Sequence, residues 1–305
     1  MRILAVDIGT NSVRSIICDI DDNGVISVVH RGGEITRLGQ DLHATGALDP
    51  KAVERTADAV ATIVDNAQKL NVEKTILAAT SAARDAKNSQ YFIQKIKERT
   101  GTVPEILSGM REAQTIYRGV VHEISDPCEN LVILDIGGGS TECICHPVSG
   151  EITLNSVDIG AVRMTDRFIR NDPPRADELR EMRSFVEKTF RDGVRSECLS
   201  GMKLIGVGGT ITTLAAILLE LEVYDHNKVH GYFMTRKAVG TTLERLASMD
   251  LEQRKFVAGL SPKRADIIIA GIVVLEAFLD FAEFNELRVS DRGILFGLAL
   301  EASGL

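Results

Sequence analysis

The sequence VDIGTNS at residues 6–12 decides the fold, because it returns as LDIGGGS at residues 134–140. Each copy follows an apolar stretch typical of a buried strand, and each precedes two further stretches typical of strands. In both halves of the chain, helices and strands then alternate. A repeat of this kind predicts two similar α/β domains that face each other across a cleft.

The repeat also indicates how the chain divides. We expect one domain at residues 1–125 and a second at residues 126–305, with the boundary at Asp126-Pro127. The last expected helix, residues 293–302, packs either on its own domain or back on the first. Helices are expected near residues 50–70, 88–99, 110–121, 176–195, 209–220, 236–248, 263–282 and 293–302, and strands near 3–6, 13–20, 25–30, 75–79, 103–107, 131–134, 141–146, 151–157, 203–206 and 287–289.

Composition is typical of a globular protein that needs neither a metal nor a disulfide for stability. The chain has 305 residues, of which 44% are hydrophobic and 26% are charged, and it is long enough to bury a core. A net charge of −8 disfavours a DNA- or RNA-binding protein. It is still compatible with a polyanion held in a locally basic cleft.

Membrane and secretory classes are disfavoured as well. The longest apolar run, residues 267–275, is well short of the roughly 20 residues that span a bilayer. The apolar stretch at residues 3–6 stops at Asp7, which is too short for a signal peptide. The five cysteines contain no C-x-x-C pair, which indicates reduced thiols and a cytoplasmic protein.

The two repeated turns are candidate phosphate-binding loops. Glycine lets the backbone turn tightly and bring its N–H groups to an anion. Gly9 and Gly137 occupy matching positions, and nearby side chains add donors, namely those of Thr10, Asn11, Ser12, Ser140 and Thr141. One Asp-x-Gly turn alone is often a plain turn, whereas two at matching positions favour a binding site.

A third glycine-rich turn, residues 206–210, opens an apolar helix. The N-terminus of a helix is a ready anion site, but the glycines are equally well explained by close packing of strand and helix. The chain contains no Walker A or G-x-G-x-x-G pattern, which disfavours P-loop and Rossmann proteins. It also lacks H-E-x-x-H and G-x-S-x-G, which disfavours zinc proteases and α/β-hydrolases.

Charged residues complete the candidate site. Arg84 follows a predicted buried strand, at the end where α/β folds bind ligands, and it either clamps a phosphate or forms a salt bridge to Asp85 or another neighbour. Glu112 stands in the first turn of a predicted helix, where complementing the helix dipole is the alternative role. Asp135 and Glu142 flank the second glycine turn, and carboxylates beside a phosphate cradle suit Mg²⁺.

These motifs occur together, in this order, in the exopolyphosphatase / guanosine pentaphosphate phosphohydrolase (Ppx/GppA) family, which the chain resembles over essentially its whole length. The chain is similar to the short form of the family, without the C-terminal HD-like domain of longer members. The resemblance rests on DIGTNSVR at residues 7–14, ATSAARDAKN at 79–88, ILSGMREA at 106–113, DIGGGSTE at 135–142 and GVGGT at 206–210.

The resemblance implies a duplicated actin-like fold, of the superfamily of sugar kinases, heat-shock chaperones and actin, with the site in the interdomain cleft. It implies a cytoplasmic hydrolase that removes the terminal phosphate of inorganic polyphosphate, of pppGpp to give ppGpp, or of both, by metal-assisted in-line attack of water. The expected partners are therefore polyphosphate or guanosine penta- and tetraphosphate, with no DNA, RNA or membrane. Homodimers recur among the relatives.

The same resemblance assigns roles to residues of this chain. Glu112 is expected to activate the attacking water, and Asp135 and Glu142 to hold Mg²⁺ or another divalent cation. Two alternatives stay open, a kinase or ATPase of the same superfamily and a non-catalytic ppGpp-binding protein. The implied phosphate-binding residues are Asp7, Gly9, Thr10, Asn11, Ser12, Arg14, Arg84, Gly137, Gly138, Gly139, Ser140, Thr141, Gly208, Gly209 and Thr210.

Overall fold

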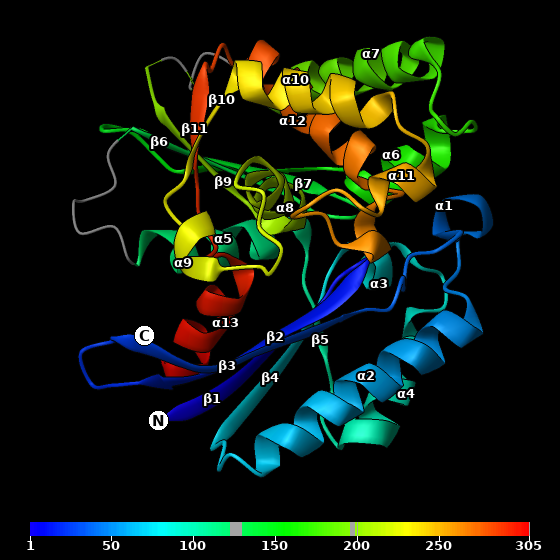
Figure 1. Cartoon of the computed structure of the whole chain (residues 1–305). Helices are drawn as coiled ribbons and strands as arrows, with labels where there is room; N and C mark the ends of the chain where they lie inside the picture. Colours follow the sequence, from blue (N-terminus) through cyan, green and yellow to red (C-terminus); the bar gives the residue numbers. More distant parts are fainter. Residues whose placement is uncertain (123–129, 196–198, 200, 305) are drawn as a thin grey trace. The chain divides into compact units, whose positions relative to one another are not determined.

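The computed structural model describes residues 1–122, 130–195, 199 and 201–304 (Figure 1). Contacts between residues separate two compact units. Within the described part of the chain, the first unit takes residues 1–122 and 293–304, and the second takes residues 130–292. The boundary expected at Asp126-Pro127 lies outside the described residues.

The first unit is built on a mixed sheet in the order β3-β2-β1-β4-β5. Strands β1, β2 and β3 pair antiparallel, and β4 and β5 continue the sheet in parallel with β1. The bounds are β1 (Arg2–Ile8), β2 (Ser12–Ile20), β3 (Ile26–Ile35), β4 (Lys74–Ala79) and β5 (Glu105–Ile106).

Different helices cover the two faces of this sheet (Figure 1). On one face, alternate residues of β1 pack into a core with the buried faces of α2 and α4, as the two-residue period of a strand requires. On the other face, α13 packs against α5, β1, β2 and β4. The helices are α1 (Leu42–Thr45), α2 (Pro50–Gln68), α3 (Ser81–Asp85), α4 (Ser89–Thr100), α5 (Gly109–Val121) and α13 (Ile294–Ser303).

The second unit repeats this plan. Its sheet has the order β10-β11-β9-β6-β7-β8, with β6, β7 and β8 antiparallel and β9 and β11 parallel to β6. Its strands are β6 (Leu131–Ile136), β7 (Thr141–His146), β8 (Thr153–Val157), β9 (Lys203–Val207), β10 (Phe233–Thr235) and β11 (Glu286–Val289). Its helices are α6 (Ala161–Phe168), α7 (Ala176–Gly193), α8 (Gly208–Leu218), α9 (His226–Val229), α10 (Arg236–Ala247), α11 (Leu251–Arg254), a 3₁₀ turn at Pro262–Arg264 and α12 (Ile268–Phe281).

The order β8-β7-β6-β9-β11 in the second unit matches β3-β2-β1-β4-β5 in the first. The α/β class and the duplication predicted from the repeated turn are therefore confirmed. The turn between β1 and β2 and the turn between β6 and β7 take the same place in the two sheets. What differs is the addition of β10 at the edge of the second sheet.

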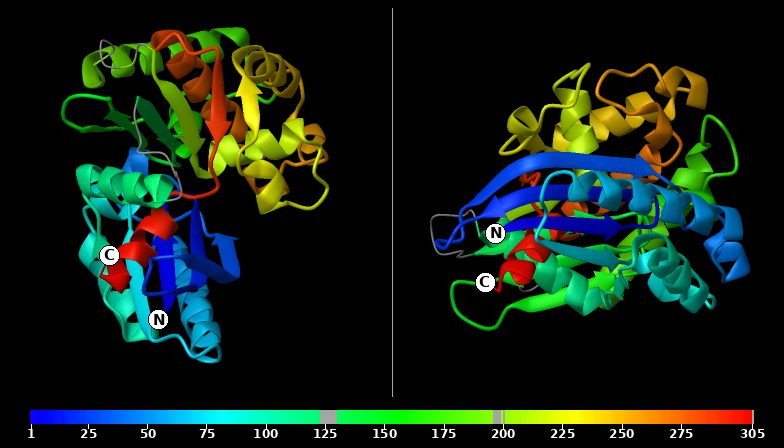
Figure 2. Two further views of the ribbon diagram at one scale, coloured as in Figure 1. Left: turned by 90° about the vertical axis from the view of Figure 1, so that its left-hand side faces the viewer. Right: turned by 90° about the horizontal axis from the view of Figure 1, so that it is seen from below.

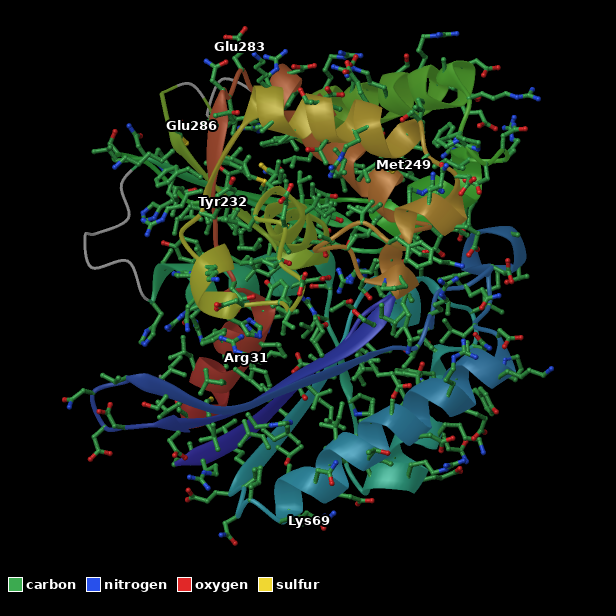
Figure 3. All side chains as sticks on the ribbon, in the orientation of Figure 1. Arg31, Lys69, Tyr232, Met249, Glu283 and Glu286 are labelled. Carbon is green, nitrogen blue, oxygen red and sulfur yellow. The ribbon has the colours of Figure 1, made fainter. Side chains whose placement is uncertain are left out.

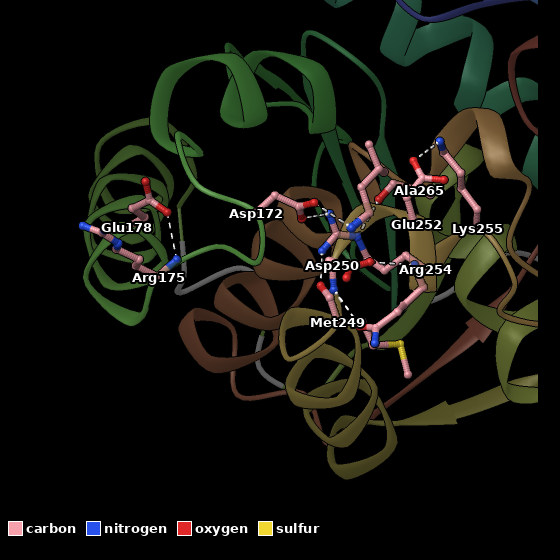
Figure 4. Close-up of polar contacts among 11 residues, drawn as sticks. Asp172, Arg175, Glu178, Met249, Asp250, Glu252, Arg254, Lys255 and Ala265 are labelled. Carbon is pink, nitrogen blue, oxygen red and sulfur yellow. Dashed lines mark hydrogen bonds and ion pairs between the residues drawn. The ribbon is translucent and has the colours of Figure 1, made fainter.

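The core of the second unit explains its most apolar helix. The helix α12 is buried along most of its length because it packs against α6, α7, α8 and α10. Beside this core, the buried Arg254 donates hydrogen bonds to the carbonyl oxygens of Met249 and Ala265 and to Asp172 (Figure 4). One guanidinium therefore ties together the loops on either side of α11.

Some elements differ from the sequence-based expectations. The strand expected at residues 25–30 continues to Ile35 as β3, because Gly32 and Gly33 stay paired with β2. The helix expected at 263–282 is split into the 3₁₀ turn and α12. Helix α6 and strand β10 were not expected. None of the helices in the described part of the chain has the length and hydropathy that crossing a bilayer requires.

Candidate active site

Glu112 lies in the first turn of α5 and is 7% exposed. The helix begins here because Ser108 caps it, with its hydroxyl accepting a 3.2 Å hydrogen bond from the backbone N–H of Arg111. The N-terminus of a helix carries partial positive charge, which favours an anionic side chain or ligand. The predicted catalytic carboxylate is therefore a largely buried group at a defined helix start.

Arg84 contacts this carboxylate directly. Its Nη1 donates a 3.0 Å hydrogen bond to Oε2 of Glu112 and a 2.9 Å hydrogen bond to the carbonyl oxygen of Leu107. The alternative partner, Asp85, is farther away, with 3.8 Å between Nε of Arg84 and Oδ1. The structure thus brings together Arg84 and Glu112, two residues that the sequence places on separate elements.

The first glycine turn is closed by a 3.0 Å hydrogen bond from the N–H of Gly9 to the carbonyl oxygen of Ser12. Its carbonyl groups bind the segment after β3. The oxygen of Asn11 accepts from the N–H groups at residues 36 and 37, and the oxygen of Thr10 accepts from the N–H of Gly39. These bonds fix the turn that was predicted to bind phosphate.

Asp7 and Arg14 stand opposite each other on β1 and β2. Nη2 and Nε of Arg14 donate to Oδ2 of Asp7, at 2.7 and 3.2 Å. Asp7 is buried, whereas Arg14 is partly exposed. Two residues that were both predicted to bind substrate phosphate thus form an ion pair with each other, and Asp7 serves to hold Arg14.

The second glycine turn has the same closing bond, 3.0 Å from the N–H of Gly137 to the carbonyl oxygen of Ser140. Its carbonyl groups are bound by the start of α6. The oxygen of Gly138 accepts from two N–H groups of α6, and the oxygen of Gly139 accepts a 2.8 Å hydrogen bond from Nε of Arg163. Gly160 allows this close approach, because a Cβ there would lie 2.6 Å from the backbone of Gly138.

Asp135 and Glu142 take the positions in β6 and β7 that Asp7 and Arg14 take in the first unit. They stand opposite each other in the ladder, where side chains of an antiparallel pair lie on the same face. Asp135 is 6% exposed and Glu142 is 1% exposed, and Ser156 donates a 2.8 Å hydrogen bond to Oε1 of Glu142. Where the first unit has an ion pair, the second has two buried carboxylates.

This donor set fits Mg²⁺. The ion takes oxygen ligands and is commonly bound by one or two carboxylates together with substrate phosphates and water. Asp135 and Glu142 supply two carboxylates on neighbouring strands. Among the described residues there is no group of three or more His, Cys, Asp or Glu side chains arranged to hold a metal ion. Two protein carboxylates leave the other positions around a bound Mg²⁺ to phosphate oxygens and water.

Close packing accounts for two glycines of the third turn, and its role in anion binding stays a prediction. Gly206 permits close packing, because a Cβ there would lie 2.5 Å from Leu287. Gly208 has φ of +87°, and a Cβ there would collide with Oδ1 of Asp135. The side chain of Thr210 faces Gly271 on α12, so only its backbone remains suited to an anion at the start of α8.

Three residues around these turns were missed by the sequence reasoning. Arg264 places its guanidinium directly against Gly209 at the start of α8. Arg163 binds the second glycine turn, and Ser156 binds Glu142. Arg163 ends the stretch DIGAVR at residues 158–163, which also resembles a block of the Ppx/GppA family but was given no role in the site. For Arg264 and Ser156 the only available signal was their charge or hydroxyl group.

Comparison with known proteins gives consistent matches. Residues 16–303 match the Ppx/GppA phosphatase family. Exopolyphosphatase 2 of Mycobacterium tuberculosis is 33% identical, over 99% of both chains. A guanosine-5'-triphosphate,3'-diphosphate pyrophosphatase of Vibrio atlanticus is 27% identical, and the match covers 97% of this chain but 58% of that protein. The crystal structure of the Aquifex aeolicus Ppx/GppA family member superposes with a TM-score of 0.80 at 31% identity, over 99% of this chain and 97% of that one.

Proposed function

This chain belongs to the Ppx/GppA phosphatase family, and we propose that it hydrolyses the terminal phosphoanhydride bond of inorganic polyphosphate by in-line attack of water. The observation that carries the proposal is the contact between Arg84 and Glu112. It pairs a cation suited to phosphate with a largely buried carboxylate at the start of a helix.

Glu112 orients the attacking water and accepts its proton. Phosphoryl transfer to water needs an aligned nucleophile and stabilisation of the charge on the equatorial oxygens. A carboxylate with a fixed position can align the attacking water. Glu112 is fixed by its place in the first turn of α5 and by its hydrogen bond from Arg84. Water is the phosphate acceptor in this scheme, so no second substrate has to bind. This distinguishes the proposed hydrolase from a kinase.

Positive groups and hydrogen-bond donors of each unit stabilise the charge on the equatorial oxygens. In the first unit, Arg84 and Arg14 carry the charge, and the turn at residues 9–12 supplies N–H and side-chain donors. In the second unit, the donors are the turn at residues 137–141 and the start of α8 at residues 208–210, where Arg264 stands against Gly209. A chain of phosphates carries enough charge to engage many such donors.

Asp135 and Glu142 are the residues that would hold Mg²⁺, with Ser156 orienting Glu142. When bound, the ion would neutralise phosphate charge and polarise the bond that breaks. Gly208 keeps space beside the Asp135 carboxylate that any side chain would fill.

A second substrate, pppGpp, is supported by the similarity to the Vibrio atlanticus guanosine-5'-triphosphate,3'-diphosphate pyrophosphatase. Both substrates end in a phosphoanhydride, so the same reaction serves both. We place its action in the cytoplasm, where free cysteines such as the buried Cys18, Cys143 and Cys145 stay reduced.

Phosphate release from short polyphosphate, long polyphosphate, pppGpp and ATP, measured side by side with no acceptor present, tests the proposal. We expect release from polyphosphate or pppGpp with a kcat/KM well above that for ATP. Phosphate transfer only after an acceptor is added would identify a kinase instead. Equilibrium binding of ppGpp without turnover of any of the four compounds would identify a binding protein.

A further inference from the structure

The helix that carries Glu112 is in backbone contact with α13 (Figure 2). A Cβ on Gly119 of α5 would collide with the carbonyl oxygen of Gly293, and a Cβ on Gly297 of α13 would collide with that of Thr115. Where two helix backbones touch, a small shift of one helix along the other produces a clash, so their relative position is narrowly defined. The placement of α5 therefore depends on α13.

One side chain of α13 binds α5 at several points. Glu301 is 9% exposed on its side chain, and its two oxygens accept from the guanidinium of Arg111 at 2.9 and 2.6 Å. Thr115 donates a further 3.1 Å hydrogen bond to Oε1, and Arg118 lies 3.8 Å from the same oxygen. A two-point pairing of arginine and carboxylate fixes orientation as well as distance.

These partners form one stripe of α5. Arg111, Thr115 and Arg118 follow the spacing of residues on one face of a helix. Glu112 is the next residue after Arg111, about 100° further round the helix, where Arg84 binds it. The first turn of α5 is thus held on two sides, by Arg84 at the carboxylate itself and by Glu301 at the neighbouring residue.

Other contacts already hold α13 in place. Lys74 donates a 2.6 Å hydrogen bond to the carbonyl oxygen of Ala302. The guanidinium of Arg31, which is labelled in Figure 3, lies 5.4 Å from the ring centre of Phe296. The pair of Glu301 with Arg111 is partly buried, since the Arg111 side chain is 37% exposed, and ion pairs of this kind add little net stability. The contacts of Glu301 with α5 therefore point to alignment of α5 more than to attachment of α13.

We infer that Glu301 is a positioning residue of the proposed hydrolysis, because it fixes the first turns of α5 through Arg111 and Thr115 and so aligns the Glu112 carboxylate with the attacking water. The inference rests on the proposed function of Glu112. Its consequence is that kcat depends on a residue that acts on Glu112 only through α5.

The test is Glu301→Gln, which keeps the shape of the side chain and removes its charge. A misplacement of about 1 Å at a reacting group costs on the order of 100-fold in rate. We expect kcat to fall about 10- to 100-fold while KM changes less than about twofold. Amide hydrogen exchange at Arg111 and Glu112 should accelerate in the same variant, which is a readout independent of turnover.

Two further variants separate alignment from plain stability. Lys74→Met removes an anchor of α13 at Ala302 without touching α5, and we expect it to lower the melting temperature and leave kcat unchanged. Thr115→Val removes one of the hydrogen bonds to Glu301, together with the bond of the same hydroxyl to the carbonyl oxygen of Arg111, at nearly constant volume. It should lower kcat by a smaller factor than Glu301→Gln, and it remains informative if that variant fails to fold.

The outcomes distinguish this inference from the proposed function. If Glu112→Gln abolishes turnover while Glu301→Gln and Thr115→Val lower the melting temperature with kcat unchanged, Glu301 is structural and the inference is wrong. If Glu112→Gln keeps normal turnover, the role given to Glu112 is wrong and the inference about Glu301 falls with it, although hydrolysis itself stands. If the parent protein releases no phosphate from polyphosphate or pppGpp, the proposed function is wrong before any variant is compared. A fall in kcat for both Glu301→Gln and Lys74→Met, in proportion to lost stability, also contradicts positioning.

Discussion

Nη1 of Arg84 lies 3.0 Å from Oε2 of Glu112 and 2.9 Å from the carbonyl oxygen of Leu107. One guanidinium nitrogen therefore joins the segment that follows β4 to the segment that begins α5. Arg84 has two tasks in the proposed reaction, because it orients the carboxylate and also brings positive charge to the place where phosphate is expected. The two predicted roles, phosphate ligand and ion-pair partner, do not exclude each other.

Removing this cation should impair turnover. Arg84→Met breaks a hydrogen bond to a charged group, which is worth about 1.5–3 kcal/mol. We expect kcat/KM to fall about 10- to 100-fold, measured as phosphate release from polyphosphate.

The matched control for this variant is Arg99→Met, since Arg99 pairs with Glu54 and Asp58 on the surface and exposed pairs contribute little. It should keep kcat/KM within about twofold of the parent. Equal losses in both variants would mean that net charge, and not the contact with Glu112, is responsible.

The carboxylate pair of the second unit predicts a dependence on divalent cations. We expect chelation of divalent cations to abolish activity and Glu142→Gln to raise the Mg²⁺ concentration that gives half-maximal activity. Ser156→Ala should raise that concentration about tenfold, because it removes the hydrogen bond that orients Glu142.

Mg²⁺ titrations of phosphate release at fixed substrate check these shifts. Ser248→Ala is the control, since Ser248 binds a backbone carbonyl of α10 and not a carboxylate. An unchanged Mg²⁺ dependence in Glu142→Gln would remove Glu142 from the metal site.

Glu178 on α7 predicts how stability varies with pH. Burial alone raises the pKa of its carboxyl, but hydrogen bonds from the N–H of Arg175, the side chain of Asn171 and the N–H of Arg170 outweigh it, and the pKa is lowered from 4.5 (Figure 4 draws the Arg175 contact). A lowered pKa means that the ionised carboxylate favours the folded state. Its contribution is complete above the unfolded pKa and is lost as pH falls below it.

Glu178→Gln should therefore be less stable than the parent at pH 7, by about 1 kcal/mol as for a lost helix cap, with the difference shrinking as pH falls below about 4.5. Urea unfolding at several pH values measures it. Glu181→Gln, at an exposed position of the same helix, should show no such trend. A difference that stays constant down to acidic pH would contradict the assignment to ionised Glu178.

Short-range patterns made much of the fold predictable. The repeated turn predicts matching units, and the sheets bear this out because the strand order β3-β2-β1-β4-β5 returns as β8-β7-β6-β9-β11. Ser108 predicts the start of α5 because a cap acts within one turn. By contrast, Gly32 and Gly33 conceal the true length of β3, since pairing with β2 overrides their low strand propensity.

The candidate site was predictable as a set of residues but not as a set of contacts. The pairing of Asp7 with Arg14 follows from the register of a hairpin and was within reach of the sequence. The contact of Glu301 with Arg111 joins residues far apart in the chain, and no local pattern indicates it. The same holds for Arg264 at Gly209, because tertiary packing alone brings them together.

The measurement closest to the central claim is single- and multiple-turnover kinetics of Glu112→Gln at saturating polyphosphate, with exposed Glu105→Gln as the control. Losing the group that activates water should lower kcat about 10²- to 10⁴-fold, leave polyphosphate affinity intact and leave the control unchanged. A Glu112→Gln variant that is folded, binds polyphosphate and releases phosphate at nearly the parental kcat would contradict the account.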